Sequence, residues 1–141
     1  MSRTAARLLA TAIVLWASAA LADRNVTFQQ GDNNGYAGTV DTRITSAAPN
    51  TSYATATTIE VDRAGTAVED EGLIRFNDII GNGPNQIPPG SQILSATLTL
   101  YNTKAGDPAS VFRMLVPWQD TDTWNTLVNG VQDAGVEYAS T

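Results

Sequence analysis

Apolar and polar residues alternate with a period of two in several short stretches of this chain, which is typical of β-strands. In the clearest stretch, residues 93–101, one face carries Leu94, Ala96, Leu98 and Leu100, and the other carries Ser95, Thr97, Thr99 and Tyr101. Weaker patterns of the same kind predict further strands over 26–28, 40–44, 57–61, 72–77 and 111–116. Turn residues separate these stretches, and no segment has the period of a helix. The sequence therefore predicts an all-β protein, an antiparallel β-sandwich of the jelly-roll type.

A Pro-Asn turn and a threonine-rich stretch precede the predicted strand 57–61. Residues 47–62 read AAPNTSYATATTIEVD. The β-branched residues Thr and Val have restricted χ1 angles and suit a pleated surface, so they favour a strand behind the turn. We expect Tyr53 to lie on a loop at the rim of the sandwich, where it either covers the core or meets a ligand.

Residues 1–22 have the three parts of a secretory signal peptide. Arg3 and Arg7 give a positive start, residues 8–15 form an apolar run, and Ala20-Leu21-Ala22 is a small-x-small cleavage site. The apolar run is too short to span a membrane, and no second one follows. We therefore expect a secreted protein, extracellular or periplasmic, that is cleaved near Ala22 and has one domain over 23–141.

The composition narrows the possible functions. The chain has 8 basic and 14 acidic residues and a net charge of −6, and removal of residues 1–22 with their two arginines makes this about −8. Such a surface argues against nucleic acid and anionic lipid as partners. The chain has no cysteine and no histidine, which excludes disulfides, ordinary zinc sites and Ser-His or Cys-His nucleophile pairs. Oxygen ligation of a hard cation and catalysis by carboxylates alone remain.

Four segments that follow one another between Asp41 and Asn125 carry a family resemblance. They read DTRITSAAPNTSYATATTIEVD, GLIRFND, IPPGSQILSATLTLY and VFRMLVPWQDTDTWN. Together they resemble the DNRLRE-type domain, also described as disaggregatase-related, a secreted module assigned to carbohydrate binding in some members. The resemblance covers most of the chain after residue 22. It implies a carbohydrate-binding β-sandwich that has no catalytic residues and belongs to a larger polypeptide on the bacterial surface.

The chain departs from the family pattern at two places. Ala54 stands where the family has a glycine after the turn tyrosine, so we expect this loop to adopt a conformation without positive φ. The chain also ends at Thr141, before the last strands of the family pattern. We therefore expect the sandwich to be incomplete at its C-terminus, with an open edge and exposed apolar surface.

Aromatic rings and one arginine are the candidate sugar-binding residues. Sugars stack their C–H faces on exposed rings, and their hydroxyls need polar partners. The candidate rings are Tyr36, Tyr53, Tyr101, Trp118 and Trp124. Arg75 is the candidate hydrogen-bond donor to a hydroxyl or a uronate. The alternatives are core packing for the rings and a structural ion pair of Arg75 with Asp41 or Glu60.

Acidic residues near the predicted strands are candidate calcium ligands, because calcium binds six to eight oxygens in loops of this kind. They are Asp41, Asp62, Glu69, Asp70 and Glu71. None lies in an EF-hand loop, and a solvated acidic loop is the alternative. No pair of acids lies in a recognisable catalytic motif, so we expect a non-catalytic module that attaches a larger protein to polysaccharide. The alternatives are an accessory module of a secreted hydrolase, such as a metallophosphoesterase or polysaccharide lyase, and a structural spacer without a ligand site.

Overall fold

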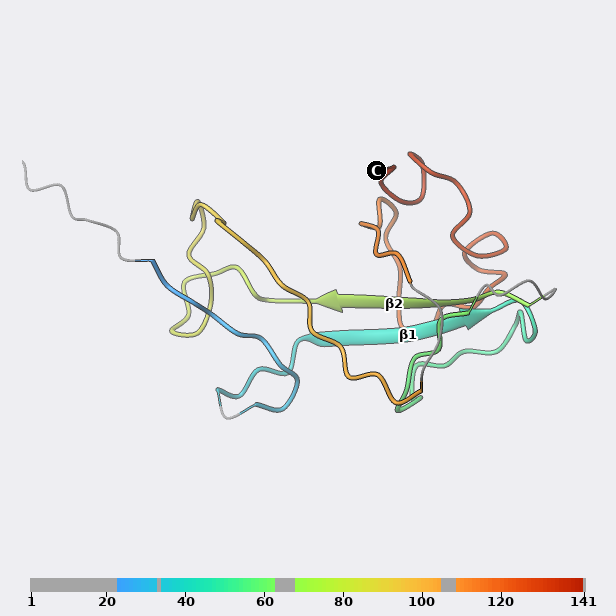
Figure 1. Cartoon of the computed structure of the whole chain (residues 1–141), viewed down its shortest axis with the longest axis horizontal. Helices are drawn as coiled ribbons and strands as arrows, with labels where there is room; N and C mark the ends of the chain where they lie inside the picture. The colour runs from blue at the N-terminus through green and yellow to red at the C-terminus, as the bar shows by residue number, and fades with distance from the viewer. Residues whose placement is uncertain (1–22, 33, 63–67, 105–108, 141) are drawn as a thin grey trace, which may run out of the picture.

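The described part of the chain contains one small β-sheet and no helix. The computed structural model describes residues 23–32, 34–62, 68–104 and 109–140, so the predicted signal peptide lies outside it. Strand β1 (Thr39–Thr45) and strand β2 (Asp70–Phe76) pair antiparallel (Figure 1). In these residues, no helix is long and apolar enough to cross a membrane. The described residues are thus consistent with the mostly-β part of the prediction, and they do not show the predicted sandwich or jelly roll.

Strands β1 and β2 correspond to the predicted strands 40–44 and 72–77, with small shifts at their ends. Thr42 pairs with Leu73, and Val40 pairs with Arg75. Directly paired residues point to the same face of a sheet. One face therefore carries Val40, Thr42 and Ile44 of β1 beside Glu71, Leu73 and Arg75 of β2.

This face of the sheet forms the core together with residues 118–131, called the C-terminal segment below. Ile44 and Leu73 pack against three residues of that segment, and these are Trp118, Trp124 and Leu127. Figure 1 shows the segment beside the end of the sheet where β1 finishes and β2 begins. Asp41, on the other face of β1, is exposed, whereas Thr42 and Ile44 are buried. The alternation read from the sequence thus matches the burial of residues 41–44, while Thr45, on the face of Asp41, is also buried.

Two side chains of β2 hold the C-terminal segment in place. Arg75 donates from Nη1 to the carbonyl oxygen of Trp118 at 2.7 Å, and its Cζ lies 4.8 Å from the centre of the Trp118 ring. Glu71 accepts a hydrogen bond from the backbone N–H of Val131 at 2.8 Å. Hydrogen bonds to charged groups are stronger than neutral ones. These two contacts fix the segment at both ends of its path over the sheet.

The second face of the sheet lies beside the threonine-rich stretch. Arg43 forms an ion pair with Glu60, and its Cζ lies 4.3 Å from the centre of the Tyr53 ring. A Cβ on Gly72 would come within 3.1 Å of the Val61 side chain, so the stretch passes close to β2. The predicted strand 57–61 is nevertheless not a strand. It is followed by one isolated bridge, between Asp62 and Asp70.

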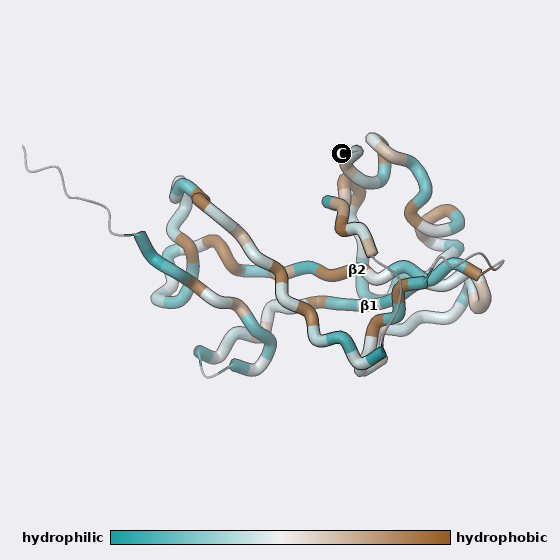
Figure 2. Tube along the Cα trace, in the orientation of Figure 1, coloured by the Kyte–Doolittle hydropathy of each residue, from teal (hydrophilic) through white to brown (hydrophobic). Residues whose placement is uncertain are grey.

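Three further predicted strands do not join a ladder. Residues 26–28 have no strand partner, and residues 111–116 contribute one isolated bridge, from Met114 to Tyr138. Residues 93–101 follow a stretched path across the view in Figure 1, and brown apolar bands interrupt that path in Figure 2. They are neither helical nor paired. Alternation predicts the residues suited to a strand, but a ladder also needs a partner strand, and the described residues place none there.

Ala54 has no positive φ, as expected. The described non-glycine residues with positive φ are Asp78, Val128 and Asn129. The Pro-Asn turn therefore continues through Ala54 without backbone strain, and it packs against the C-terminal segment. The backbone N–H of Asn125 donates to the Pro49 carbonyl at 3.0 Å, and the Asn125 side chain donates to the Asn50 side chain at 2.8 Å.

The close approach of Gly130 to Trp124 gives a test of this core. Gly130 has φ +88°, and a Cβ there would lie 2.7 Å from the Trp124 ring. We expect Gly130→Ala to lower the free energy of unfolding by about 1–3 kcal/mol more than Gly135→Ala. Gly135 has φ +83° and no atom within 4 Å of an added Cβ, so it controls for backbone strain alone. Equal losses in urea denaturation would show that Trp124 does not pack as described.

Candidate functional site

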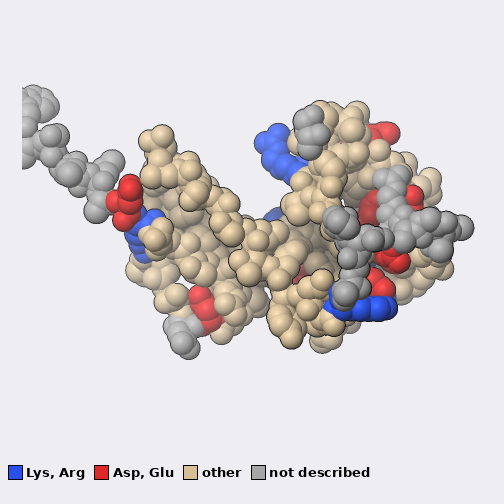
Figure 3. Space-filling view, viewed as in Figure 1, with Lys and Arg blue, Asp and Glu red and all other residues tan. Residues whose placement is uncertain are grey.

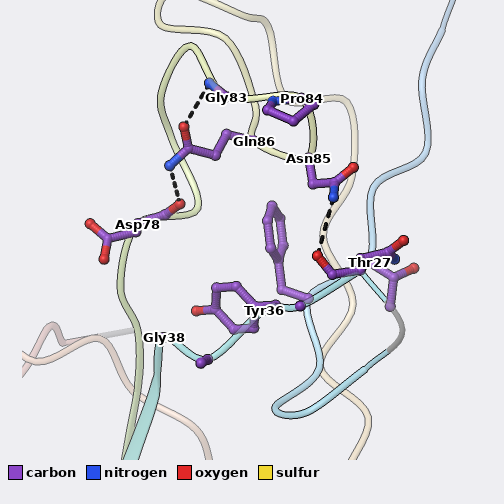
Figure 4. A pocket seen from close by; sticks show the side chains of 12 residues that line it. Thr27, Tyr36, Gly38, Asp78, Gly83, Pro84, Asn85 and Gln86 are labelled. Atoms are coloured by element: carbon purple, nitrogen blue, oxygen red, sulfur yellow. Dashed lines mark hydrogen bonds between the residues drawn. The ribbon is translucent and has the colours of Figure 1, made fainter.

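A hollow lies at the other end of the sheet, away from the tryptophan core. It is formed by the N-terminal segment and by the loop that follows β2, and its volume is about 400 Å³. Figure 4 shows these two walls facing each other. The lining residues are Thr27, Phe28, Asn34, Gly35, Tyr36, Ala37, Gly38, Asp78, Gly83, Pro84, Asn85 and Gln86.

A tight turn forms the aromatic wall of the hollow. Asp32 accepts hydrogen bonds at Oδ1 from the backbone N–H groups of Asn34, at 3.0 Å, and Tyr36, at 3.2 Å. Aspartate side chains commonly bond backbone groups two residues ahead, and this favours turns. The turn brings Tyr36 back to Phe28, and the two rings meet edge to face with centres 5.2 Å apart. This geometry stabilises an aromatic pair.

The side chain of Gln86 closes the opposite wall. Its Oε1 accepts from the backbone N–H of Gly83 at 2.8 Å, and its Nε2 donates to the Asp78 carbonyl at 2.7 Å (Figure 4). The loop is closed further by backbone bonds between Ile79 and Ile87, at 2.8 Å, and between Gly81 and Ile87, at 2.9 Å. A Gly- and Pro-rich loop is thereby held in one shape.

Four hydrogen bonds join the two walls, and one of them runs from the backbone N–H of Asn77 to the Gly38 carbonyl at 2.8 Å. Asn85 donates from Nδ2 to the Asn34 carbonyl at 3.2 Å, and Arg24 donates to the Pro84 carbonyl at 2.7 Å. The hydroxyl of Tyr36 donates to the Asn77 carbonyl at 2.8 Å, just after β2. Since β1 begins shortly after Tyr36 and β2 ends just before Asn77, the sheet itself brings the walls together.

The hollow presents neutral and acidic groups. Burial raises the pKa of Tyr36 above its ordinary value of 10.0, and the nearby Asp78 carboxylate raises it further. Tyr36 is therefore a neutral hydrogen-bonding group at physiological pH. Asp78 is the one carboxylate among the lining residues. The arrangement suits a neutral ligand with apolar faces and several hydroxyl groups, because rings and planar amides lie together.

The structure does not bring the residues proposed from the sequence for sugar binding into one site. Trp118 and Trp124 are 5% and 8% exposed and belong to the core. Tyr53 is half-buried beneath Arg43, whereas Tyr101 is 93% exposed. The two tryptophans thus occupy the positions that the core-packing alternative predicts.

Arg75 makes neither of the ion pairs considered for it. Its guanidinium contacts the carbonyl and ring of Trp118, and Glu60 pairs with Arg43 instead. The side chain therefore serves the contact between β2 and the C-terminal segment.

The candidate calcium ligands are not gathered into a metal site. Asp62 and Asp70 pair through their backbones, with N···O distances of 3.0 and 2.8 Å, while Asp41 lies on β1 opposite Ile74. The Glu69 and Glu71 side chains accept hydrogen bonds from Gln132 at 3.2 and 3.5 Å. Over the described ranges, no group of three or more Asp, Glu, His or Cys side chains is placed to hold an ion.

A second hollow, of about 390 Å³, surrounds the exposed Tyr101. Its lining is more aliphatic than that of the first, with Ile59, Val61 and Leu100 beside Asn102 and Lys104. This second hollow is lined by one aromatic ring and one side-chain amide, whereas the hollow of Phe28 and Tyr36 is lined by two rings and three amides. The first hollow therefore has more groups that recognise a hydroxyl-rich ligand.

Comparison of the chain with protein-family models, with characterised proteins and with solved structures found no match. The resemblance to the DNRLRE-type domain thus stays a prediction from the sequence. Sequence reasoning missed Phe28, Asn85 and Gln86, which line the first hollow. The run GNGPNQ at residues 81–86 was the available signal, because it places amides in a turn-rich loop.

The raised pKa of Tyr36 predicts a specific alkaline loss of stability. A phenol that ionises at higher pH in the folded state stabilises the fold fully below pH 10, the unfolded pKa, and this contribution is lost as the pH rises through the folded pKa. Tyr36→Phe removes this pH-dependent contribution to stability and also the hydrogen bond to the Asn77 carbonyl. We expect the variant to be about 1 kcal/mol less stable at pH 8, and the difference to shrink above pH 10. Parallel stability curves from pH 8 to 12 would contradict this assignment.

Proposed function

We propose that this chain is a secreted, non-catalytic module that binds polysaccharide and attaches a larger extracellular protein to it. The single observation that supports this best is the hollow in which the Phe28 and Tyr36 rings meet the side chains of Asn34, Asn85 and Gln86. The proposal includes membership of the DNRLRE-type family and its jelly-roll β-sandwich. Strands β1 and β2 supply one antiparallel pair of that sandwich.

The hollow has the size and chemistry of a sugar subsite. Its volume of about 400 Å³ lies within the roughly 300–1,000 Å³ of small-molecule sites. Rings bind the apolar C–H faces of a sugar, and amides both donate to and accept from hydroxyls. The side chain of Gln86 is already committed to the loop backbone at both ends. Asn85, in contrast, is exposed at the rim of the hollow. It is the amide best placed to give up its hydrogen bond to the Asn34 carbonyl and to bind a ligand hydroxyl instead.

Weak binding at one site suits such a module. The hollow is open to solvent, and part of its polar side chains already bond the protein backbone, so we expect low intrinsic affinity. Repeated sites on a polymer raise the effective affinity, since each rebinding event is intramolecular. The acidic charge of the chain favours neutral polysaccharides over strongly acidic ones.

A structural spacer without a ligand site is the second candidate function. The burial of Trp118 and Trp124 favours it, because the two largest candidate rings serve the core. The two candidates differ in what the hollow of Phe28 and Tyr36 does. Binding that depends on residues of that hollow supports the polysaccharide module, and its absence supports the spacer.

Affinity electrophoresis with an asparagine pair tests the proposed function. The full chain is run through gels that contain alginate, pectin, xylan or a soluble cellulose derivative, and we expect retardation on at least one neutral polymer. Asn85→Ala should weaken that binding about fivefold, the effect of losing one hydrogen bond. Asn82→Ala is the matched control, because Asn82 lies in the same loop and does not line the hollow.

Two results would count against the proposal. One is the absence of retardation on every polymer by a chain whose amide spectra show that it is folded. The other is equal retardation of Asn85→Ala and the unsubstituted chain, which would place any binding outside this hollow.

A further inference from the structure

Residues 93–101 have the sequence of a strand, but no strand of the described residues pairs with them. The segment is exposed along its whole length, and the leucines at 94, 98 and 100 are 67%, 45% and 57% exposed. In the described chain, the neighbouring backbone bonds are from Ser91 to Pro88 and from Lys104 to the Asn102 side chain. Between them, the N–H and C=O groups of residues 93–101 make no hydrogen bond to other described residues. Exposed strand edges of this kind are templates for another strand.

The sequence of this segment is complementary to itself in the antiparallel direction. When two copies pair with Thr97 opposite Thr97, every side chain meets one of its own kind. The pairs are Ile93 with Tyr101, Leu94 with Leu100, Ser95 with Thr99, and Ala96 with Leu98. The leucine and alanine pairs lie on one face, and the Ser and Thr pairs lie on the other together with the pair of Ile93 and Tyr101. Cross-strand pairs of this type stabilise a sheet.

Neighbouring registers match less well. A register centred on Ala96 would place Leu100 opposite Gln92 and Tyr101 opposite Ser91. A register centred on Leu98 would place Leu94 opposite Asn102. The hydrophobic pattern therefore selects the pairing centred on Thr97, which also has the longest overlap.

No charge opposes this pairing. Between Asp78 and Lys104 the chain has no charged residue, although its net charge is −6. Figure 3 shows the middle of this face as mostly tan, with the charged atoms gathered towards the two ends. Natural edge strands are usually protected by lysine, other charges or proline within the strand, and residues 93–101 contain none of these.

We propose that two copies of this chain associate through residues 93–101, as antiparallel strands with Thr97 on the two-fold axis. A two-fold contact is closed, since the same patch serves both copies. In this pairing, the backbone N–H and C=O groups of the two segments form hydrogen bonds with each other, and the leucine-bearing faces of the two segments lie side by side. This association is independent of the hollow proposed to bind polysaccharide.

Single cysteines test the register directly, because the chain has no cysteine of its own. In Thr97→Cys, the two Cα atoms are expected about 4.5–5.5 Å apart, within disulfide range. In Thr99→Cys, each cysteine faces Ser95, and the two Cα atoms are about 14 Å apart, too far to bridge. On mild oxidation of the full chain, we expect at least tenfold more disulfide-linked dimer from Thr97→Cys.

Two like charges placed opposite each other test the same contact without oxidation. Thr97→Lys places two positive charges opposite each other on the axis, so sedimentation equilibrium should show about fivefold weaker dimerisation. Salt should restore part of the loss. Thr103→Lys is the control, because it adds the same charge outside the paired residues.

Three outcomes would overturn the proposal. The first is an unsubstituted chain that stays monomeric at every concentration tested. The second is equal crosslinking of Thr97→Cys and Thr99→Cys, which indicates parallel in-register stacking, where each residue meets its own copy. The third is slow hydrogen exchange at residues 93–101 in the monomer, which indicates that a strand of the same molecule covers them.

Discussion

A two-stranded sheet buries too little surface to be stable unless something covers one of its faces. In this protein the cover is the C-terminal segment, which places Trp118, Trp124 and Leu127 on Ile44 and Leu73. The segment has no regular secondary structure to fix its path, so side chains of β2 do this instead. Arg75 contacts both the carbonyl and the ring of Trp118, and Glu71 accepts from Val131. The described fold depends on these long-range contacts more than on backbone ladders.

The same two strands position the other end of the molecule. Tyr36 lies shortly before β1, and Asn77 lies directly after β2, so the antiparallel register brings them together and their hydrogen bond closes the base of the hollow. Core and hollow therefore occupy opposite ends of one ribbon (Figure 1). A change that disturbs the register of β1 and β2 should affect both ends, although the core and the lining of the hollow have no residue in common. This coupling explains how a site on loops can have a defined shape.

The alternation of apolar and polar residues predicted β1 and β2 correctly. These two strands pair with each other, and one face of the pair is covered. The same pattern at 57–61, 93–101 and 111–116 did not produce strands, since the pattern reports the side chains that suit a sheet and not the presence of a partner. The presence of a tryptophan likewise does not distinguish core packing from ligand binding for Trp118 and Trp124. Protein cores and ligand sites both favour large amphipathic rings. The hollow of Phe28, Tyr36 and Gln86 joins residues about fifty positions apart, and no local signal marks such a contact. The residue types at 32–35 and at 81–86 each indicate a turn or loop, but neither run indicates that the two lie together.

Trp124 and its neighbours hold β1 and β2 together. Amide hydrogen exchange on the full chain with Trp124→Ala tests it most directly. We expect the amides of residues 39–45 and 70–76 to lose most of their protection together, because the uncovered strand pair is no longer stable. Protection of both strands equal to that of the unsubstituted chain would contradict it.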